Sequence, residues 1–288
     1  MVLTAMRRLF AAGSRRFIFA TVLLVPFFAY AQDGAKESLY AFSFSQFFGF
    51  KYGHSEEIVY KSSKSDVVLS QLIWEMKPLF YLGGAFDFRL REPMIRRGFF
   101  INAAAQAGIP VQTGDMTDKD WLAPNNGFSH FSRHSNFTDE AWFLDVKAGM
   151  SFPVRDITRL QFFATISFMW LKWTARDGYT QYADLTGNTY KPWNPSLPKT
   201  YLHGAVISYE QNWVMLSPGI SAHIPFLEFF EAGLYFQIAP LVYCSDLDKH
   251  YLRNTNFTET MWGGFMLEPG LEFVFSPYEW LGLSINVS

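Results

Sequence analysis

The sequence predicts an all-β protein, a transmembrane antiparallel up-and-down β-barrel. Three observations support this prediction. Apolar and polar residues alternate with a period of two in one segment after another, as in strands with two different faces. The connections between these segments alternate between short and long, and no apolar run after residue 31 is long enough for a membrane-spanning helix.

Residues 1–31 are organised like a secretory signal peptide. Two arginine pairs, at 7–8 and 15–16, precede an apolar run over 17–30. Ala29-Tyr30-Ala31 offers a small-x-small cleavage site, so we expect the mature chain to begin near Gln32. A membrane anchor is the weaker alternative, because the run is shorter than the roughly 20 residues that span a bilayer.

The first two strands are predicted from the longest alternating segments. Aromatic residues hold every second position near the start and end of 40–52, with serine, glycine and lysine on the other face. In the second segment, 71–90, we place Leu72, Trp74 and Met76 on one face together with Phe80 and Leu82. Such strands are longer than the usual 5–6 residues of soluble sheets, which favours a barrel over a sandwich.

Seven further strands continue the pattern. They are predicted near 99–109, 142–152, 161–172, 212–224, 229–243, 261–275 and 280–287. Short connections lie at 91–98, 153–159, 225–228 and 276–280, and long polar ones near 53–66, 113–139, 174–208 and 244–258. Bacterial barrels have short periplasmic turns and long external loops, so the long set is expected to face outward. Residues 32–288 then form one domain.

This count gives about nine strands, an odd number. Single-chain bacterial barrels use even numbers, so that the first and last strands pair antiparallel. We therefore expect the C-terminal strand to be missing, in a truncated product or in a wall with an open seam that lowers stability.

Composition excludes other classes of protein. The chain is 49% hydrophobic and 17% charged with a net charge of −2, so neither disorder nor a polyanion partner is indicated. We expect no nucleic-acid binding. The single cysteine, Cys244, rules out an internal disulfide, and without an HExxH motif or a cysteine pair we expect no metal.

Two short polar motifs in the long connections could carry chemistry. They are Asp118-Lys119-Asp120 and Asp248-Lys249-His250. In extended backbone the first and third residues of each motif share a face, so three carboxylates and an imidazole could converge on one cavity. Such a set can share protons and activate a water molecule without a metal. Spacing alone is more typical of solvated loop charge or of an adventitious calcium contact than of catalysis.

The same motifs resemble those of the omptin family. Met116-Thr117-Asp118-Lys119-Asp120-Trp121 is similar to the family's M-x-D-x-D-W motif, and Asp246-Leu247-Asp248-Lys249-His250-Tyr251 to D-x-D-x-H-Y. Shorter matches occur in family order across most of the mature chain: Ser70-Gln71-Leu72-x-Trp74, Ser132-Arg133-His134, Thr174-Ala175-Arg176-x-Gly178 and Tyr209-x-Gln211.

The resemblance implies a ten-stranded outer-membrane barrel with an aspartic endopeptidase site facing outside. Asp118 and Asp120 would form the catalytic pair, His250 the general base, and Asp248 its orienting partner. The resemblance further implies peptide or protein substrates with basic residues and no cofactor.

Four further residues receive secondary roles from the same resemblance. Glu57 and Asp246 fall where the family's acidic groups bind a basic residue beside the cleaved bond. Ordinary loop charge explains Glu57 as well. Ser132 and His134 are expected to support the site through hydrogen bonds.

One departure concerns lipid. Omptins bind lipopolysaccharide through charged side chains at the outer ends of central strands, where this chain has Phe168, Trp170 and Asn212. We therefore expect that lipopolysaccharide site to be absent, although outer-membrane lipid surrounds the barrel. Two other functions remain open: a catalytically inactive barrel that acts as an adhesin or receptor, and a small-solute porin.

Overall fold

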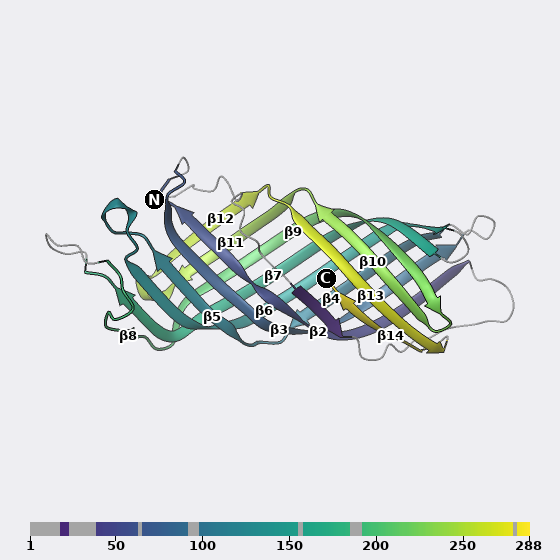
Figure 1. Ribbon diagram of the computed structural model, residues 1–288, viewed down its shortest axis with the longest axis horizontal. Coiled ribbons are helices and arrows are strands. Elements are labelled where there is room, and N and C mark those ends of the chain that lie inside the picture. Colours follow the sequence, from purple (N-terminus) through teal and green to yellow (C-terminus); the bar gives the residue numbers. More distant parts are fainter. Residues whose placement is uncertain are drawn as a thin grey trace.

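The wall of the protein is one antiparallel β-sheet rolled into a barrel (Figure 1). The computed structural model describes residues 18–22, 39–62, 65–91, 98–154, 158–184, 192–278 and 281–288. The strands are β1 (Ile18–Val22), β2 (Tyr40–Tyr60), β3 (Val68–Arg91), β4 (Gly98–Gly108), β5 (Val111–Asp120), β6 (His130–Val154), β7 (Thr158–Tyr182), β8 (Thr200–Tyr201), β9 (Ala205–Leu227), β10 (Phe230–Ala239), β11 (Val242–His250), β12 (Thr255–Trp262), β13 (Met266–Tyr278) and β14 (Leu281–Val287).

In several places two strands that follow each other in the chain together make one crossing of the barrel wall, or pass. Both β4 and β5 lie between β3 and β6, while β10 and β11 pair with β9 on one side and with β13 and β12 on the other. Between residues 39 and 288 the described chain therefore makes nine passes, as the sequence predicted.

The predicted open seam is filled by β1. This strand pairs antiparallel with β14 through Ala20–Val22 and with β2 through Ile18–Val22, and so joins the first and ninth passes with the required polarity. The closing segment lies within the predicted signal peptide, whose remaining residues, cleavage site included, fall outside the described chain. Cleavage after Ala31 would remove β1 and leave the facing edges of β2 and β14 without it.

The outer surface carries a broad apolar belt. Alternate residues point outward along the long strands and are exposed, among them Tyr40, Phe42 and Phe44 on β2, and Leu216 and Ile220 on β9. An outward apolar band of this kind requires lipid, because water would not solvate it favourably. The rings of Tyr243 and Trp262 pack with their centroids 4.6 Å apart, like the aromatic side chains in the girdles of membrane barrels.

One predicted face was wrong. Leu82 is 56% exposed on the outer surface, whereas Trp74 on the same strand is 0% exposed and points inward. The register between β2 and β3 shifts where Lys51 pairs with Leu79 and Gly53 with Met76. This bulge adds a residue to β3. The faces of residues 70–76, toward the N-terminal end of the strand, are therefore reversed relative to those of residues 79–90.

The inward residues on both sides of the bulge form a hydrophobic core. The rings of Trp74, Trp173 and Tyr209 stack with centroids 5.5–6.2 Å apart, and Met116 and Leu79 are also fully buried. The interior is therefore packed at this level. A packed interior argues against the small-solute porin.

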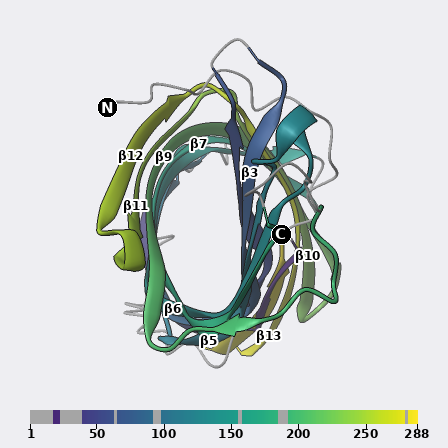
Figure 2. The same cartoon turned by 90° about the vertical axis from the view of Figure 1, so that its left-hand side faces the viewer.

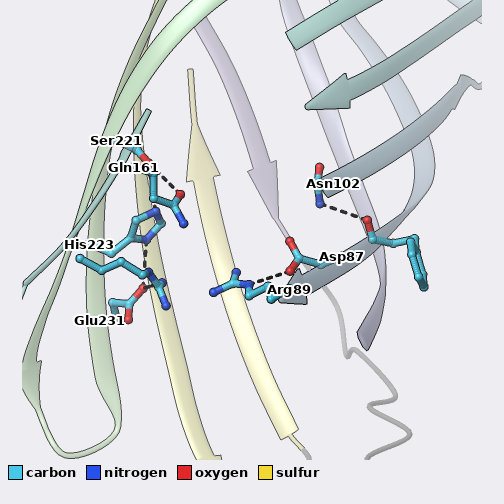
Figure 3. A network of polar contacts seen from close by, with 9 residues as sticks. Asp87, Arg89, Asn102, Gln161, Ser221, His223 and Glu231 are labelled. Atoms are coloured by element: carbon cyan, nitrogen blue, oxygen red, sulfur yellow. Dashed lines mark hydrogen bonds and ion pairs between the residues drawn. The ribbon is translucent and has the colours of Figure 1, made fainter. Parts of the chain in front are cut away.

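The opposite end of the barrel, at the right of Figure 1, carries a network of ion pairs (Figure 3). Glu231 Oε1 lies 3.0 Å from His223 Nδ1 and 3.0 Å from Arg159 Nη2. Arg89 Nε donates a 2.7 Å hydrogen bond to Asp87. Polar residues on the inner face thus contact one another through hydrogen bonds and ion pairs, as the alternation of apolar and polar residues in the sequence predicted.

The predicted long loops are largely strand. β2 continues to Tyr60, β5 and β6 are separated by nine residues, and η3 (Tyr251–Arg253) turns β11 into β12. A further short helical turn in the described chain is η1 (Pro124–Asn126). Among the described residues, no helix is long and apolar enough to cross a membrane. The wall therefore extends well beyond the apolar belt at the left end of Figure 1.

We predict that Trp173→Ala lowers the free energy of unfolding by about 3–5 kcal/mol, because it leaves a cavity in the stacked core. Trp170→Ala is the matched control, since Trp170 lies on the same strand but is 39% exposed on the outer surface. Urea unfolding in detergent would measure both. Equal losses would contradict a packed interior core.

Candidate functional site

The predicted site residues lie on strands at one end of the barrel, beyond the apolar belt. Asp118 and Asp120 are on β5, Asp246, Asp248 and His250 on β11, and Glu57 on β2. Figure 2 looks along the barrel toward this end and shows an oval ring, with β11 and β12 on the left and β3 on the right. The predicted site residues thus lie at the same end of the barrel, and strands rather than loops carry them.

The aspartate pair is held by β3. Ser70 Oγ donates a 3.1 Å hydrogen bond to Asp118 Oδ1, and Ser70 is the ladder partner of Asp120. Burial, followed by the charge of Asp120, raises the pKa of Asp118 to about 7. Burial also raises the pKa of Asp120. The pair therefore retains a proton at near-neutral pH.

A histidine–aspartate dyad lies on β11 at the same end of the barrel. His250 Nε2 lies 2.7 Å from Asp248 Oδ2, and the ring meets Phe257 edge-on at 5.4 Å. Asp248 is nearly fully buried, so its carboxylate fixes the orientation of the imidazole. The charge of His250 lowers the pKa of both Asp118 and Asp120, which places the two groups within electrostatic reach.

Further carboxylates lie beside this dyad. Tyr209 donates its hydroxyl to Asp246 Oδ2 at 3.1 Å, and Gln211 Nε2 donates to the Tyr209 oxygen at 3.0 Å. Burial raises the pKa of Asp246 to about 6. Burial and then the charge of Asp248 raise the pKa of Glu57 well above its usual range. These acidic groups would be stabilised by a cation.

The two predicted supporting residues lie beneath the aspartate pair. Ser132 is buried and is the ladder partner of Asp118. His134, two residues further along β6, pairs with Met116. His134 Nδ1 contacts the backbone carbonyl of Asp177, and burial lowers the pKa of His134. We infer that His134 is a neutral ring that ties β6 to β7.

The glycine of the Thr174-Ala175-Arg176-x-Gly178 motif has a backbone role. Gly178 has a φ of +90°, and a Cβ there would lie 2.0 Å from the carbonyl oxygen of Arg133. Only glycine allows β7 to approach β6 this closely.

Three residues near the pair were missed by the sequence analysis. Ser70 lies in a quoted motif but received no role there. His130 is the ladder partner of Asp120 and packs on Tyr182, with ring centroids 4.3 Å apart. Arg253, on η3, is exposed and lowers the pKa of both aspartates. No motif marks the last two, because their positions depend on hairpin register and on the η3 turn.

The fold and the site together define a membrane barrel with a partly buried cluster of acidic side chains at one end. The chain belongs to the omptin family, whose sequence model matches residues 38–288. It is 26% identical over 211 residues to the outer membrane protease OmpP of Escherichia coli strain K12, a match that spans 71% of this chain and 62% of OmpP. It is similar in fold to the crystal structure of the outer membrane protease OmpT from Escherichia coli, with a TM-score of 0.66, 17% identity, and coverage of 97% of this chain and 96% of that one.

We predict that Asp118→Asn raises the thermal midpoint more at pH 8 than at pH 5. Because the folded pKa of about 7 exceeds the ordinary 3.8, this carboxyl favours the folded state fully at low pH, and that contribution is lost as pH rises through 7. Asparagine stays neutral throughout. Asp115→Asn, which breaks an exposed ion pair with Arg133, is expected to lower the midpoint at both pH values. A pH-independent gain would show that Asp118 titrates normally.

Proposed function

We propose that this chain is an omptin-type endopeptidase of the bacterial outer membrane, with its active site outside. The supporting observation is the 2.7 Å contact between His250 and Asp248 at the end of the barrel that also carries the Asp118–Asp120 pair, whose pKa values are raised by burial. Family membership and the resemblance to two proteins named as outer membrane proteases add to it.

The proposed reaction is a metal-independent hydrolysis of a peptide bond. His250, oriented by Asp248, removes a proton from a water molecule held between the dyad and the aspartate pair. That water attacks the peptide carbonyl, and the C–N bond then breaks as His250 returns the proton to the departing amine. The proton on the Asp118–Asp120 pair is positioned to form a hydrogen bond with the carbonyl oxygen as negative charge develops there.

The substrates are proposed to be peptides or proteins with basic residues beside the cleaved bond. Glu57 and Asp246 have buried carboxyl groups with raised pKa values. A guanidinium or ammonium would restore their charge through charge-assisted hydrogen bonds.

We predict that Asp118→Asn and His250→Ala each reduce cleavage of an Arg-Arg peptide by at least about 100-fold, because each removes a group that moves or positions a proton. Heat-dependent gel mobility would confirm that both variants fold. Glu140→Gln, at an outer-surface ion pair with Lys172, is the control and should retain activity. Activity within tenfold of the parent in both variants would reject the catalytic assignment. A folded parent that binds but never cleaves would favour the adhesin or receptor.

The acidic pocket gives a separate prediction. Asp246→Asn should reduce the preference for arginine and lysine over neutral residues by about tenfold, because a charge-assisted hydrogen bond is lost in a partly desolvated pocket. Cleavage of a peptide library by the parent and the variant would measure this preference. If both choose the same residues, basic side chains bind elsewhere.

A further prediction concerns lipid. Phe168 and Trp170 are exposed on the outer surface, and Asn212 is the ladder partner of Trp170. Since these uncharged side chains cannot neutralise lipid phosphates, we expect activity in detergent without lipopolysaccharide. Activity would be assayed with and without added lipopolysaccharide. A large stimulation would contradict this expectation.

A further inference from the structure

Glu259 is an acidic residue that the catalytic scheme does not use. It lies on β12 as the ladder partner of Asp246, and its backbone N–H donates a 3.1 Å hydrogen bond to Asp246 Oδ1. Residues opposite each other in an antiparallel ladder project to the same face, and like charges there are destabilising. The position therefore costs stability unless a cation enters.

Three buried carboxylate oxygens in this region lack a protein partner. Among the described residues, Oε2 of Glu57, Oε2 of Glu259 and Oδ1 of Asp248 accept no hydrogen bond. Glu57 is only 9% exposed, so its free oxygen is poorly solvated. Native proteins rarely leave buried acceptors without a partner. These oxygens therefore lack the hydrogen-bond donors that buried acceptors ordinarily have.

The electrostatic surroundings of these carboxylates would also favour a cation. After burial, the strongest influences on the pKa of Glu57 are the carboxylates of Asp248, Glu259, Asp246 and Asp118. For Glu259, burial followed by Asp246 and Asp248 raises the pKa to about 7. The influences identified on both groups are therefore burial and negative charge.

The acids approach the pocket from different strands. Glu57 belongs to β2, whereas Asp246 and Glu259 belong to β11 and β12. Tyr209 fixes Asp246 from below and is itself stacked on Trp74. A planar guanidinium has five donors and can bond to carboxylates on more than one edge, whereas an ammonium acts as a compact point charge.

We propose that Glu259 is a specificity-determining residue that completes, with Glu57 and Asp246, a three-carboxylate pocket for the guanidinium of a substrate arginine. This inference rests on the proposed endopeptidase function. It adds a third acid to the pocket and a preference for arginine over lysine.

The test compares Glu259→Gln with the parent on three peptides that differ only in the residue entering the pocket: arginine, lysine or citrulline. Citrulline has the shape of arginine without its charge. We expect kcat/KM to fall by about tenfold for arginine, less for lysine and less than twofold for citrulline. Glu140→Gln should leave all three values unchanged. A loss that is equal for arginine and citrulline would overturn the proposal.

Two further measurements separate this proposal from the proposed function. In the Asp118→Asn background, calorimetry should show arginyl-peptide binding weakened about tenfold by Glu259→Gln, even if the parent cleaves nothing. Without peptide, Glu259→Gln should raise the thermal midpoint, because a like charge opposite Asp246 is removed. Unchanged binding, or a lower midpoint, would assign Glu259 a structural role and overturn the inference.

Discussion

The stacking of Trp74, Trp173 and Tyr209 inside the barrel is the contact on which the site depends. A barrel of this size with a polar interior would fill with water, and carboxylates at its mouth would then titrate near their ordinary values. The aromatic core closes the interior below the site. Tyr209 links the two levels, since its ring belongs to the core and its hydroxyl holds Asp246. Burial is accordingly the largest cause of the raised pKa values of Asp118, Asp246 and Glu57.

The bulge opposite Tyr52 makes that core possible. Below it, β3 turns Phe80 and Leu82 to the lipid, and above it the same alternation turns Trp74 inward. Sequence periodicity predicted the number of passes and the apolar belt, because the lipid-facing alternation runs along many strands. It could not predict the reversal, since a bulge changes which face a residue occupies while leaving apolar and polar residues alternating.

The candidate site likewise combines residues that the sequence predicted with residues that it did not. Each of the two motif pairs, Asp118 with Asp120 and Asp248 with His250, is two residues apart on a strand, so local geometry alone predicts that its members share a face. Only the family resemblance predicted that the two pairs belong to one site. His130, Arg253 and Glu259 reach the site through ladder register or a turn between strands. Nothing in the spacing from Asp120 to His130, or from Asp246 to Glu259, indicates that they are ladder partners. Such contacts become visible only once the hairpin register is known.

The distribution of charge links the two parts of the proposed active site, the His250–Asp248 dyad and the acidic pocket. Asp248 is common to both: one oxygen contacts His250, while the other lacks a partner among the described residues, and the charge of Asp248 contributes to the raised pKa of Glu57. A cation bound between Glu57, Asp246 and Glu259 would offset the repulsion among these acids and Asp248. In the proposed mechanism, the basic side chain of a substrate supplies that positive charge and places the peptide bond beside His250. Substrate binding energy would then be used to organise the site before the chemical step.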